Sequence, residues 1–561
     1  MRHSKLTGKV NWVRTGIDAA AADADHLIVP DERFRLIMAR IGAGGTILTL
    51  VLLAACATLP ERVSPVPSSA FADTCNTRLG RSICPAADSR AGRTGVHALP
   101  NGRDAFAARY VLARAAERSI DVQYYIWHAD TSGGLLADAL WEAAERGVRV
   151  RMLLDDANTK GLDPVLATLD AHPNIEVRLF NPFANRSWRA GDYMGDFRRV
   201  NRRMHNKSFT VDNQVSVIGG RNIGDEYLGA DSVVAFADLD VIAAGAVVAE
   251  VSRSFDAYWN CASAYPVASL LPRPSDAMRA QLRDEWTTVR NAPPAARYLE
   301  AVRNQHFVEA ILAGTLSVEW VSARLLADDP AKVVKPPEDT TLHMLPQLEE
   351  ALGRPSNELL LVSPYFVPGR EGADALLAIA ARGVKVSILT NSLAATDVAP
   401  VYAGYSKYRE ELLRGGVRLY ELKPTALPSV EERERRLGSG GTGGSSGGGS
   451  SGASLHAKTF AVDRQRVFVG SFNLDPRSAR LNTEMGVVLE SPTLATRLAQ
   501  AFDDAIPRYA YEVRLMGDGQ GLEWIERTDG GEVRHSSSPH AGALRRLWIN
   551  FLSVLPIEWL L

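Results

Sequence analysis

The feature that most constrains the fold is an internal duplication, because three landmarks occur twice in the same order. Slowly growing distances between the copies are expected from a duplication followed by insertions, and chance would not preserve the order. The sequence therefore predicts two related halves, at residues 95–265 and 350–515, joined by a linking segment at 266–349. The paired landmarks are Arg146-Gly147 with Arg382-Gly383, residues 177–180 with 417–420, and His205 with His456, which lie 236, 240 and 251 residues apart.

Each half opens on the pattern of a β-α-β unit, in which a buried strand is followed by apolar residues at helical spacing and then by a second strand. Strands that alternate with helices favour a parallel sheet, so the predicted fold class is α/β. The three elements are expected at 119–127, 135–145 and 148–154 in the first half, and at 359–367, 373–381 and 384–389 in the second. Residues 275–307, within the linking segment, also have helical character.

A short motif, His-x-Lys-x4-Asp, occurs once in each half, and an asparagine follows each histidine by 17 residues. A lone histidine or lysine is usually a packing or surface residue, but identical spacing in two copies argues for shared chemistry. Residues two apart in a strand face the same side, so each copy is expected to place an imidazole and an ammonium on one surface. Small neighbours are expected to let a substrate approach the backbone. The residues are His205, Lys207, Asp212, Gly219, Gly220 and Asn222 in the first half, and His456, Lys458, Asp463, Gly470, Ser471 and Asn473 in the second.

With these motifs the chain resembles the phospholipase D superfamily, whose signature is a duplicated His-x-Lys-x4-Asp motif, and most closely its cardiolipin synthase C-type branch. The resemblance implies two duplicated α/β halves that form a pseudo-twofold unit with one active site between them. It also implies transfer of a phosphatidyl group, through a phosphohistidine, to an alcohol on another phospholipid, which yields cardiolipin. It spans residues 95–561, and the segments that suggest the branch are 123–128, 153–156, 219–227, 363–368 and 470–478.

The chemistry of phosphodiester cleavage fits these residues without a metal or another cofactor. Negative charge on the nonbridging oxygens needs converging donors, which two lysines and two asparagines can supply: Lys207, Lys458, Asn222 and Asn473. One histidine would attack phosphorus, and the other would protonate the leaving alkoxide and then deprotonate the incoming alcohol. The residues leave the nucleophile open, and the resemblance favours His205.

A carboxylate behind each imidazole would fix its tautomer and orientation, and the resemblance suggests Asp238 and Glu484. They follow the histidine of their own half by 33 and 28 residues. Because these spacings differ, Asp240 remains an alternative to Asp238. The motif aspartates, Asp212 and Asp463, are expected to brace the site rather than to react.

An acidic pair and a group of arginines each allow two interpretations. Asp155-Asp156 has the composition of a metal site, but it lacks a paired histidine or a second acidic cluster, so capping or loop bonding is favoured. The arginines before His205 would either guide anionic headgroups or form a solvated basic segment; they are Arg198, Arg199, Arg202 and Arg203.

The N-terminal region predicts export and a lipid anchor. The apolar run at 47–56 is too short to span a membrane and has the length of a signal-peptide core. Leu53-Ala54-Ala55-Cys56 resembles a bacterial lipobox, which implies lipidation of Cys56. Ala57, rather than Asp, after this cysteine favours a periplasm-facing lipoprotein of the outer membrane. We expect residues 1–56 to be a leader whose true start is Met38, and residues 57–94, rich in Pro and Ser, to be a tether.

Export permits disulfides, and Cys75 and Cys84 are close enough in sequence to form a small loop. Cys261 then remains, and it is expected to be a buried small apolar residue rather than a reactive thiol.

Composition and charge narrow the partners. The chain has 63 Lys+Arg against 65 Asp+Glu, whereas nucleic-acid binders usually carry a basic excess. The expected partners are a membrane and phospholipid substrates, namely phosphatidylglycerol and, as a second candidate, phosphatidylethanolamine. The sequence points to no protein partner. The alternatives are a hydrolase with water as acceptor, and a membrane-attached binding protein with a degenerate site, against which two complete motifs argue.

Two segments stand outside the halves. Residues 438–452 are almost all Gly and Ser, which predicts a flexible loop near the second motif; with its flanks we place it at 438–454. The tail at 516–561 ends in a run dense in Leu, Trp, Phe and Ile, behind Arg545-Arg546. This run would either pack on the core of the protein or lie at a membrane interface.

Overall fold

The computed structural model describes residues 58–62, 65–229, 238–304, 310, 313, 315, 318–424, 455–517, 519–556 and 558–561. Cys56, the start at Met38 and the Gly/Ser loop at 438–452 lie outside these residues. Within the described residues, no helix is both long and apolar enough to cross a bilayer.

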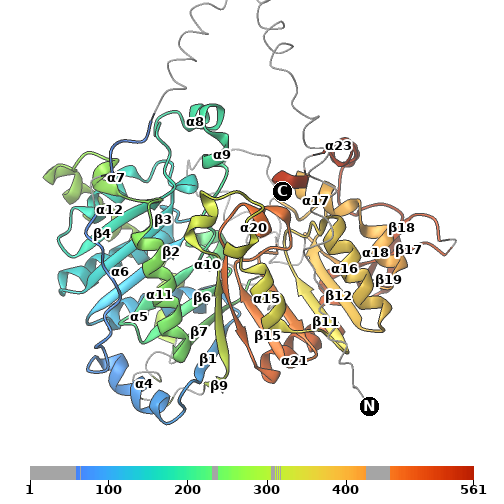
Figure 1. Ribbon diagram of the computed structural model, residues 1–561, viewed down its shortest axis with the longest axis horizontal. Helices are drawn as coiled ribbons and strands as arrows, with labels where there is room; N and C mark the ends of the chain where they lie inside the picture. Colours follow the sequence, from blue (N-terminus) through green and yellow to red (C-terminus); the bar gives the residue numbers. More distant parts are fainter. Residues whose placement is uncertain are drawn as a thin grey trace, which may run out of the picture. The chain divides into compact units, whose positions relative to one another are not determined.

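The first half is built on a nine-stranded sheet with the order β8-β4-β3-β2-β5-β6-β7-β1-β9 (Figure 1). β2, β3 and β4 pair in parallel, and the strands on either side of them pair antiparallel. The strands are β1 (Thr94–Leu99), β2 (Ser119–Tyr124), β3 (Arg149–Asp155), β4 (Ile175–Phe180), β5 (Ser208–Val211), β6 (Val215–Gly219), β7 (Asp240–Gly245), β8 (Ala264–Pro266) and β9 (Glu319–Val321).

The second half has a ten-stranded sheet with the order β10-β16-β15-β14-β11-β12-β13-β17-β18-β19. Its strands are β10 (Ala323–Ala327), β11 (Glu358–Val362), β12 (Lys385–Asn391), β13 (Arg418–Leu422), β14 (Thr459–Val462), β15 (Arg466–Gly470), β16 (Met485–Leu489), β17 (Ala510–Leu515), β18 (Leu522–Thr528) and β19 (Gly531–His535).

The two sheets repeat each other strand for strand. The order β8-β4-β3-β2-β5-β6-β7-β1 corresponds to β17-β13-β12-β11-β14-β15-β16-β10, and the parallel and antiparallel pairings match. The predicted fold class, a duplicated α/β unit, is therefore confirmed.

Helices cover these sheets. Those of the first half and the linking segment are α4 (Arg78–Asp88), α5 (Gly102–Ala115), α6 (Thr131–Glu145), α7 (Asp163–Asp170), α8 (Arg189–Gly195), α9 (Phe197–Val200), α10 (Asp225–Leu228), α11 (Ala246–Asn260), α12 (Asp276–Asn291), α13 (Pro293–Asn304) and α15 (Leu345–Leu352). Those that follow are α16 (Gly369–Ala381), α17 (Ala399–Ser406), α18 (Arg409–Arg414), α20 (Pro476–Arg480), α21 (Pro492–Gln500), α22 (Ile506–Tyr509) and α23 (Ala543–Ser553).

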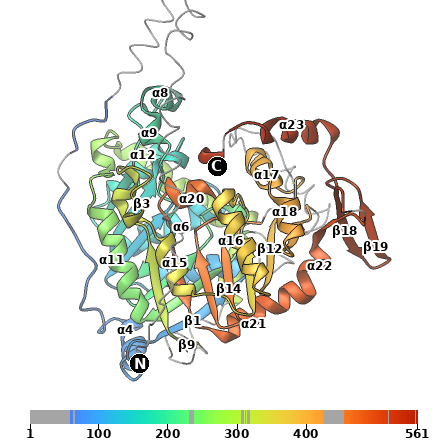
Figure 2. The ribbon, with the colours of Figure 1, turned by 45° about the vertical axis from the view of Figure 1, so that its right-hand side comes forward.

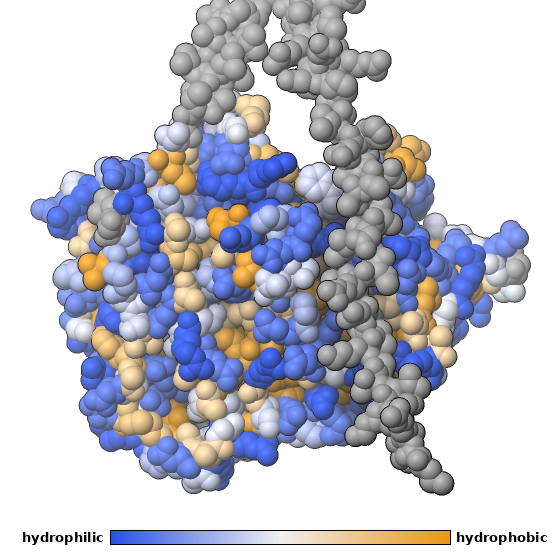
Figure 3. Space-filling view, viewed as in Figure 1, coloured by the Kyte–Doolittle hydropathy of each residue, from blue (hydrophilic) through white to orange (hydrophobic). Residues whose placement is uncertain are grey.

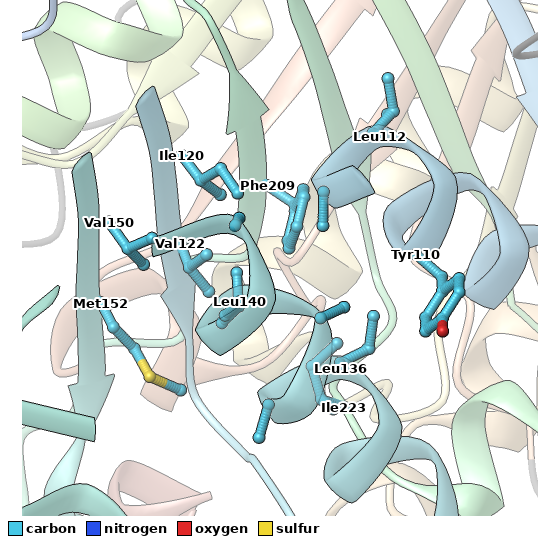
Figure 4. Close-up of a cluster of buried hydrophobic side chains, with 14 of the residues drawn as sticks. Tyr110, Leu112, Ile120, Val122, Leu136, Leu140, Val150, Met152, Phe209 and Ile223 are labelled. Atoms are coloured by element: carbon cyan, nitrogen blue, oxygen red, sulfur yellow. The ribbon is translucent and has the colours of Figure 1, made fainter. Parts of the chain in front are cut away.

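Apolar burial explains why the halves pack together. In the first half, α6 lies on the sheet, with Leu136 and Leu140 among the side chains of β2, β3 and β5 (Figure 4). A separate core contains residues of both halves, including Val241 and Val251 of the first and Val469 and Val487 of the second, all fully buried. Burial of a Val or Leu side chain contributes about 1.5–3 kcal/mol, so this shared core holds the two sheets as one unit.

The linking segment contributes to both halves. β9 extends the first sheet and β10, two residues later, joins the second. The expected helical character at 275–307 corresponds to α12 and α13, which pack against α6 and α5.

Much of the segment expected to be a tether is fixed on the first half. The side chain of Arg151 donates to the Ser68 carbonyl at 2.9 Å, and the Trp259 indole donates to Ser68 Oγ at 3.0 Å. Farther along, Cys75 and Cys84 form the expected disulfide around the start of α4. Cys261 is partly buried, and burial raises the pKa of its thiol, as expected of an unreactive cysteine.

Candidate active site

Both motif histidines lie directly before the corresponding strands, β5 and β14. We expected them inside the strands; instead each His-x-Lys segment is an extended lead-in. In the first half this lead-in pairs with the other half, because the His205 amide donates to the Thr483 carbonyl at 2.8 Å. The Thr483 amide in turn donates to the Arg203 carbonyl at 2.9 Å. Backbone hydrogen bonds between the halves therefore position the first histidine.

Each histidine is held by a carboxylate from the opposite half. His205 Nδ1 lies 2.8 Å from Glu484 Oε2, and His456 Nδ1 lies 2.7 Å from Asp238 Oδ2. Both carboxylates are the predicted ones, but each was expected behind the histidine of its own half, and the structure corrects this pairing. Asp240 is not the alternative partner, because its carboxylate forms a buried ion pair with Arg109 at 2.9 Å.

Neighbouring protein atoms leave no room for a side chain at three motif glycines. A Cβ at Gly220 would lie 2.3 Å from Asp238 Oδ1, and one at Gly219 would lie 2.1 Å from Asp240 Oδ1. A Cβ at Gly470 would lie 2.4 Å from the Met485 carbonyl of the neighbouring strand. The close approach of a substrate to this backbone stays a prediction.

Ser471 helps to fix the His205 ring. Its carbonyl lies 3.1 Å from His205 Nδ1, and its hydroxyl donates to Glu484 Oε2 at 2.5 Å. A carbonyl oxygen can only accept, so Nδ1 carries the proton. The other ring nitrogen, Nε2, then keeps its lone pair.

The motif bases form one cluster of potential positive charge. Burial, then the charges of Lys207, Lys458 and His456, hold the pKa of His205 well below its usual value. Burial also lowers the pKa of Lys207, and it lowers that of Lys458 to about 8 although Asp238 and Glu484 oppose the shift. Burial and neighbouring positive charges both disfavour the protonated forms of these bases. An anionic ligand would favour the protonated forms again.

The two carboxylates differ in charge state. Burial raises the pKa of Glu484 to about 7, despite the opposing effect of Lys207. Burial would also raise the pKa of Asp238, but the charge and hydrogen bond of His456 outweigh it and hold that pKa well below its usual range. Burial and Lys458 lower the pKa of His456, and Asp238 acts in the opposite direction. The pKa of His456 is therefore lowered overall, but Asp238 opposes the shift, whereas the pKa of His205 is held well below its usual value.

Both motif asparagines are buried and incompletely bonded. Asn222 Oδ1 accepts the Ile126 amide at 3.2 Å, while its Nδ2 has no partner among the described residues. Asn473 Oδ1 is also unpartnered within that part of the chain. A buried amide group without a partner costs about 1–3 kcal/mol, so the free Nδ2 of Asn222 is available to an acceptor on a ligand, whereas the free atom of Asn473 is itself an acceptor.

The motif aspartates lie at the far ends of β5 and β14. Asp212 accepts the amides of Glu117, Arg118 and Ser119 ahead of β2. Asp463 accepts the equivalent amides of residues 356–358 ahead of β11. A four-residue strand spans about 13 Å, so these side chains brace the strands and are remote from the histidines.

The acidic pair Asp155-Asp156 bonds within the protein. Asp155 caps the following turn and accepts the Met204 amide at 2.7 Å; Asp156 pairs with Arg186 at 3.0 Å. Of the arginines before His205, Arg203 pairs with Asp155 at 3.2 Å, and Arg202 donates to main-chain carbonyls. In the described ranges, no cluster of three or more His, Cys, Asp or Glu could hold a metal ion.

Two tyrosines that were not among the predicted site residues also line the site. The Tyr125 ring meets His205 edge-on at 4.9 Å between centroids, and the Tyr227 ring lies 5.0 Å from that of His456. Both occur in segments that carry the family resemblance, but only the structure shows that they contact the imidazoles.

Both halves of the chain are similar to known proteins. A family model described as "Cardiolipin synthase, PLD-like domain" matches residues 111–259 and 348–506, one stretch in each half. Cardiolipin synthase C of Escherichia coli (strain K12) is 47% identical over 86% of this chain and 100% of its own length. An uncharacterized protein of Helicobacter pylori (strain J99 / ATCC 700824) is 32% identical over 82% of this chain and 88% of its own.

Among solved structures, the phosphatidylserine synthase of Haemophilus influenzae Rd KW20 covers 76% of this chain and 91% of its own, with 16% identity and a TM-score of 0.47. The family match and the 47% identical relative confirm the resemblance found in the sequence. The chain belongs to the cardiolipin synthase family with a phospholipase D-like domain.

Proposed function

We propose that this protein is a phosphatidyltransferase that joins two phospholipids into cardiolipin. The observation that carries the proposal is the pair of imidazoles, each bonded to a carboxylate of the opposite half, with two buried lysines beside them. The cardiolipin synthase C relative, matched over its whole length, supplies the product.

In the first step, His205 attacks the phosphorus of a phosphatidylglycerol through Nε2. The bond from phosphorus to the headgroup oxygen breaks, and His456 gives its proton to that oxygen. The assignment of roles follows from the surroundings: the Ser471 carbonyl fixes the proton of His205 on Nδ1, and ionised Asp238 supports protonated His456.

In the second step, the hydroxyl of another phospholipid gives its proton to His456 and attacks phosphorus. The bond from phosphorus to Nε2 breaks, and His205 returns to its neutral form with a new phosphodiester released. Lys207, Lys458, Asn222 and Asn473 stabilise the charge on the nonbridging oxygens in both steps. Water in place of the alcohol would give phosphatidic acid.

The test uses the full chain with vesicles of phosphatidylglycerol, with and without phosphatidylethanolamine, and reads the lipid products. Cardiolipin is expected, together with the released headgroup alcohol, and phosphatidylethanolamine raises the yield if it serves as a second substrate. Phosphatidic acid as the sole product would identify a hydrolase. A His205→Ala chain is the matched blank, and product formed equally by this variant would contradict the mechanism.

As a member of this family the protein is a membrane-associated bacterial protein. We propose further that Cys56 is lipidated and anchors it in the outer membrane, facing the periplasm. The support is the lipobox-like sequence ending at Cys56. Labelling with a radioactive fatty acid should mark the wild-type chain and spare Cys56→Ser; equal labelling would contradict the anchor.

A further inference from the structure

The C-terminal helix α23 presents an apolar stripe to solvent. Its inner side chains, Ile549 and Leu552, are buried against the second half, where α23 packs on α17. The opposite face exposes Leu544, Leu547, Trp548 and Phe551, by 87%, 70%, 53% and 52%. These positions follow the i, i+3, i+4, i+7 spacing of one helix face. The tail is thus packed on its own core by one face and leaves the other uncovered.

A second apolar group projects from the first half, on α8, α9 and the residue before them. It consists of Trp188, Tyr193, Met194 and Phe197, exposed by 41%, 40%, 61% and 41%. Single exposed apolar residues are ordinary on soluble proteins, but a group with this aromatic content marks an interaction surface. Figures 1 and 2 both draw α8 and α23 on the same side of the molecule.

Arg477 links the two groups to each other. Its guanidinium donates to the Asn201 carbonyl, just after α9, at 2.9 Å, and to the Leu560 carbonyl at the end of the tail at 2.7 Å. Its backbone amide donates to the Leu561 carbonyl at 2.6 Å. The next residue, Ser478, donates its hydroxyl to Glu484 Oε1 at 2.8 Å, and Glu484 bonds His205. The joint between the two groups therefore adjoins the candidate active site.

Charge favours an anionic occupant of this surface. Residues 542–556 contain Arg545 and Arg546 and no acidic residue. Of the six arginines in residues 181–204, four pair with aspartates and Arg202 donates to a main-chain carbonyl, so within the described chain Arg198 is the one left without either kind of partner. Apolar side chains flanked by arginine suit the boundary between acyl chains and anionic headgroups. Figure 3 shows apolar residues on the upper edge of the molecule, where Figure 1 draws α23.

We propose that α23 and the α8–α9 projection together form a two-sided membrane-docking surface for an anionic bilayer. Trp188, Tyr193, Met194 and Phe197 insert on one side, and Leu544, Leu547, Trp548 and Phe551 on the other. This inference rests on the proposed function, and it places the site at headgroup level, where two phospholipids of one leaflet reach it without leaving the bilayer.

The kinetic test compares long-chain phosphatidylglycerol in vesicles with a short-chain, monomeric phosphatidylglycerol. Trp548→Ser/Phe551→Ser and Met194→Ser/Phe197→Ser should each lower kcat/KM on vesicles at least about tenfold, since two inserted side chains are lost, and leave it unchanged on the monomer. The matched control is Met278→Ser/Val533→Ser, at positions exposed by 43% and 44% on α12 and β19, which should change neither. Equal loss on both substrates, no loss, or loss from one pair alone would overturn the two-sided surface.

A binding readout separates failure of this inference from failure of the proposed function. Vesicles of brominated phosphatidylcholine with phosphatidylglycerol should quench tryptophan fluorescence of the full chain, and Trp188→Phe and Trp548→Phe should each lose part of that quenching. Undiminished quenching in either variant would overturn the docking surface. If the quenching behaves as expected while the wild type makes no cardiolipin, the docking surface stands and the transfer reaction fails.

Discussion

The two imidazoles share one motif but have different electrostatic surroundings. His205 lies beside a glutamate whose pKa burial raises to about 7, whereas His456 lies beside Asp238, whose pKa His456 holds low against burial. We propose that this asymmetry gives the histidines different tasks although their spacing in sequence is identical. The motif alone could predict the pair, but it could not predict the roles.

A donor lipid with a p-nitrophenol headgroup separates these roles, because that leaving group needs no proton. His456→Ala should lose about 10²–10⁴-fold of its rate on phosphatidylglycerol, the usual contribution of a general acid. The same variant should still release p-nitrophenol in a first turnover, measured by absorbance in a stopped-flow experiment. His205→Ala should release none. If His205→Ala released p-nitrophenol and His456→Ala did not, His456 would be the nucleophile and His205 the general acid.

The pH dependence follows from the buried cations. Burial lowers the pKa of Lys458 to about 8, and its charged form is the one that stabilises phosphate oxygens. Turnover should therefore fall as pH rises through about 8, and the lowered pKa of His456, which must be protonated in the first step, acts in the same direction. On the acid side, His205 must be neutral to attack, and its pKa lies well below 6.5, so activity should persist to a pH well under that value.

Lys458→Arg checks the basic limb, since a guanidinium stays charged throughout this range. Profiles of kcat/KM against pH should lose the fall near pH 8 in the variant, even where its absolute rate is lower. An unchanged basic limb would assign the titration to another group.

At the scale of elements, the motif aspartates brace strands, and burial sets how much each contributes. Asp212 is fully buried, whereas Asp463 holds amides close to solvent. Both lie at positive φ, 51° and 52°, so an alanine meets the same backbone strain in either place. Because the backbone strain is the same, alanine variants of the two aspartates can be compared directly.

Asp212→Ala should lower the free energy of unfolding by about 1–3 kcal/mol more than Asp463→Ala does, because it leaves the buried Ser119 amide without an acceptor. Water can satisfy the exposed amides of Ser356 and Asn357 that Asp463 leaves. Urea denaturation measures the difference, and turnover per folded molecule should stay close to wild type in both. A large loss of turnover in a stable variant would make the aspartate part of the chemistry.

For the whole molecule, the duplication was predictable and the crossing of the halves was not. Landmark order and β-α-β patterning are local properties, so they predict the repeated sheet. The contact between His205 and Glu484 depends on how two sheets pack through a shared core, and linear spacing carries no information on that. The same limit applies to Ser68, which forms hydrogen bonds with Arg151 and Trp259. The Pro- and Ser-rich composition of its segment does not indicate these contacts.

The disulfide contributes to the stability of the whole molecule and is compatible with the proposed export. Cys75 and Cys84 lie nine residues apart in the segment before the first half, and both sulfurs have hydrogen bonds with Gln214. Closing so short a loop stabilises a protein by about 2–3 kcal/mol, chiefly by constraining the unfolded chain. Such a bond persists in an oxidising compartment such as the periplasm.

Cys75→Ser/Cys84→Ser should therefore lower the free energy of unfolding by about 2–3 kcal/mol and leave kcat/KM unchanged at a temperature where the variant is folded. The reduced wild-type chain should behave like the variant, and the oxidised chain should regain the difference. Denaturation curves with and without reductant, beside lipid turnover, measure both quantities. A fall in turnover without a fall in stability would mean that this N-terminal loop acts on the site rather than on the fold.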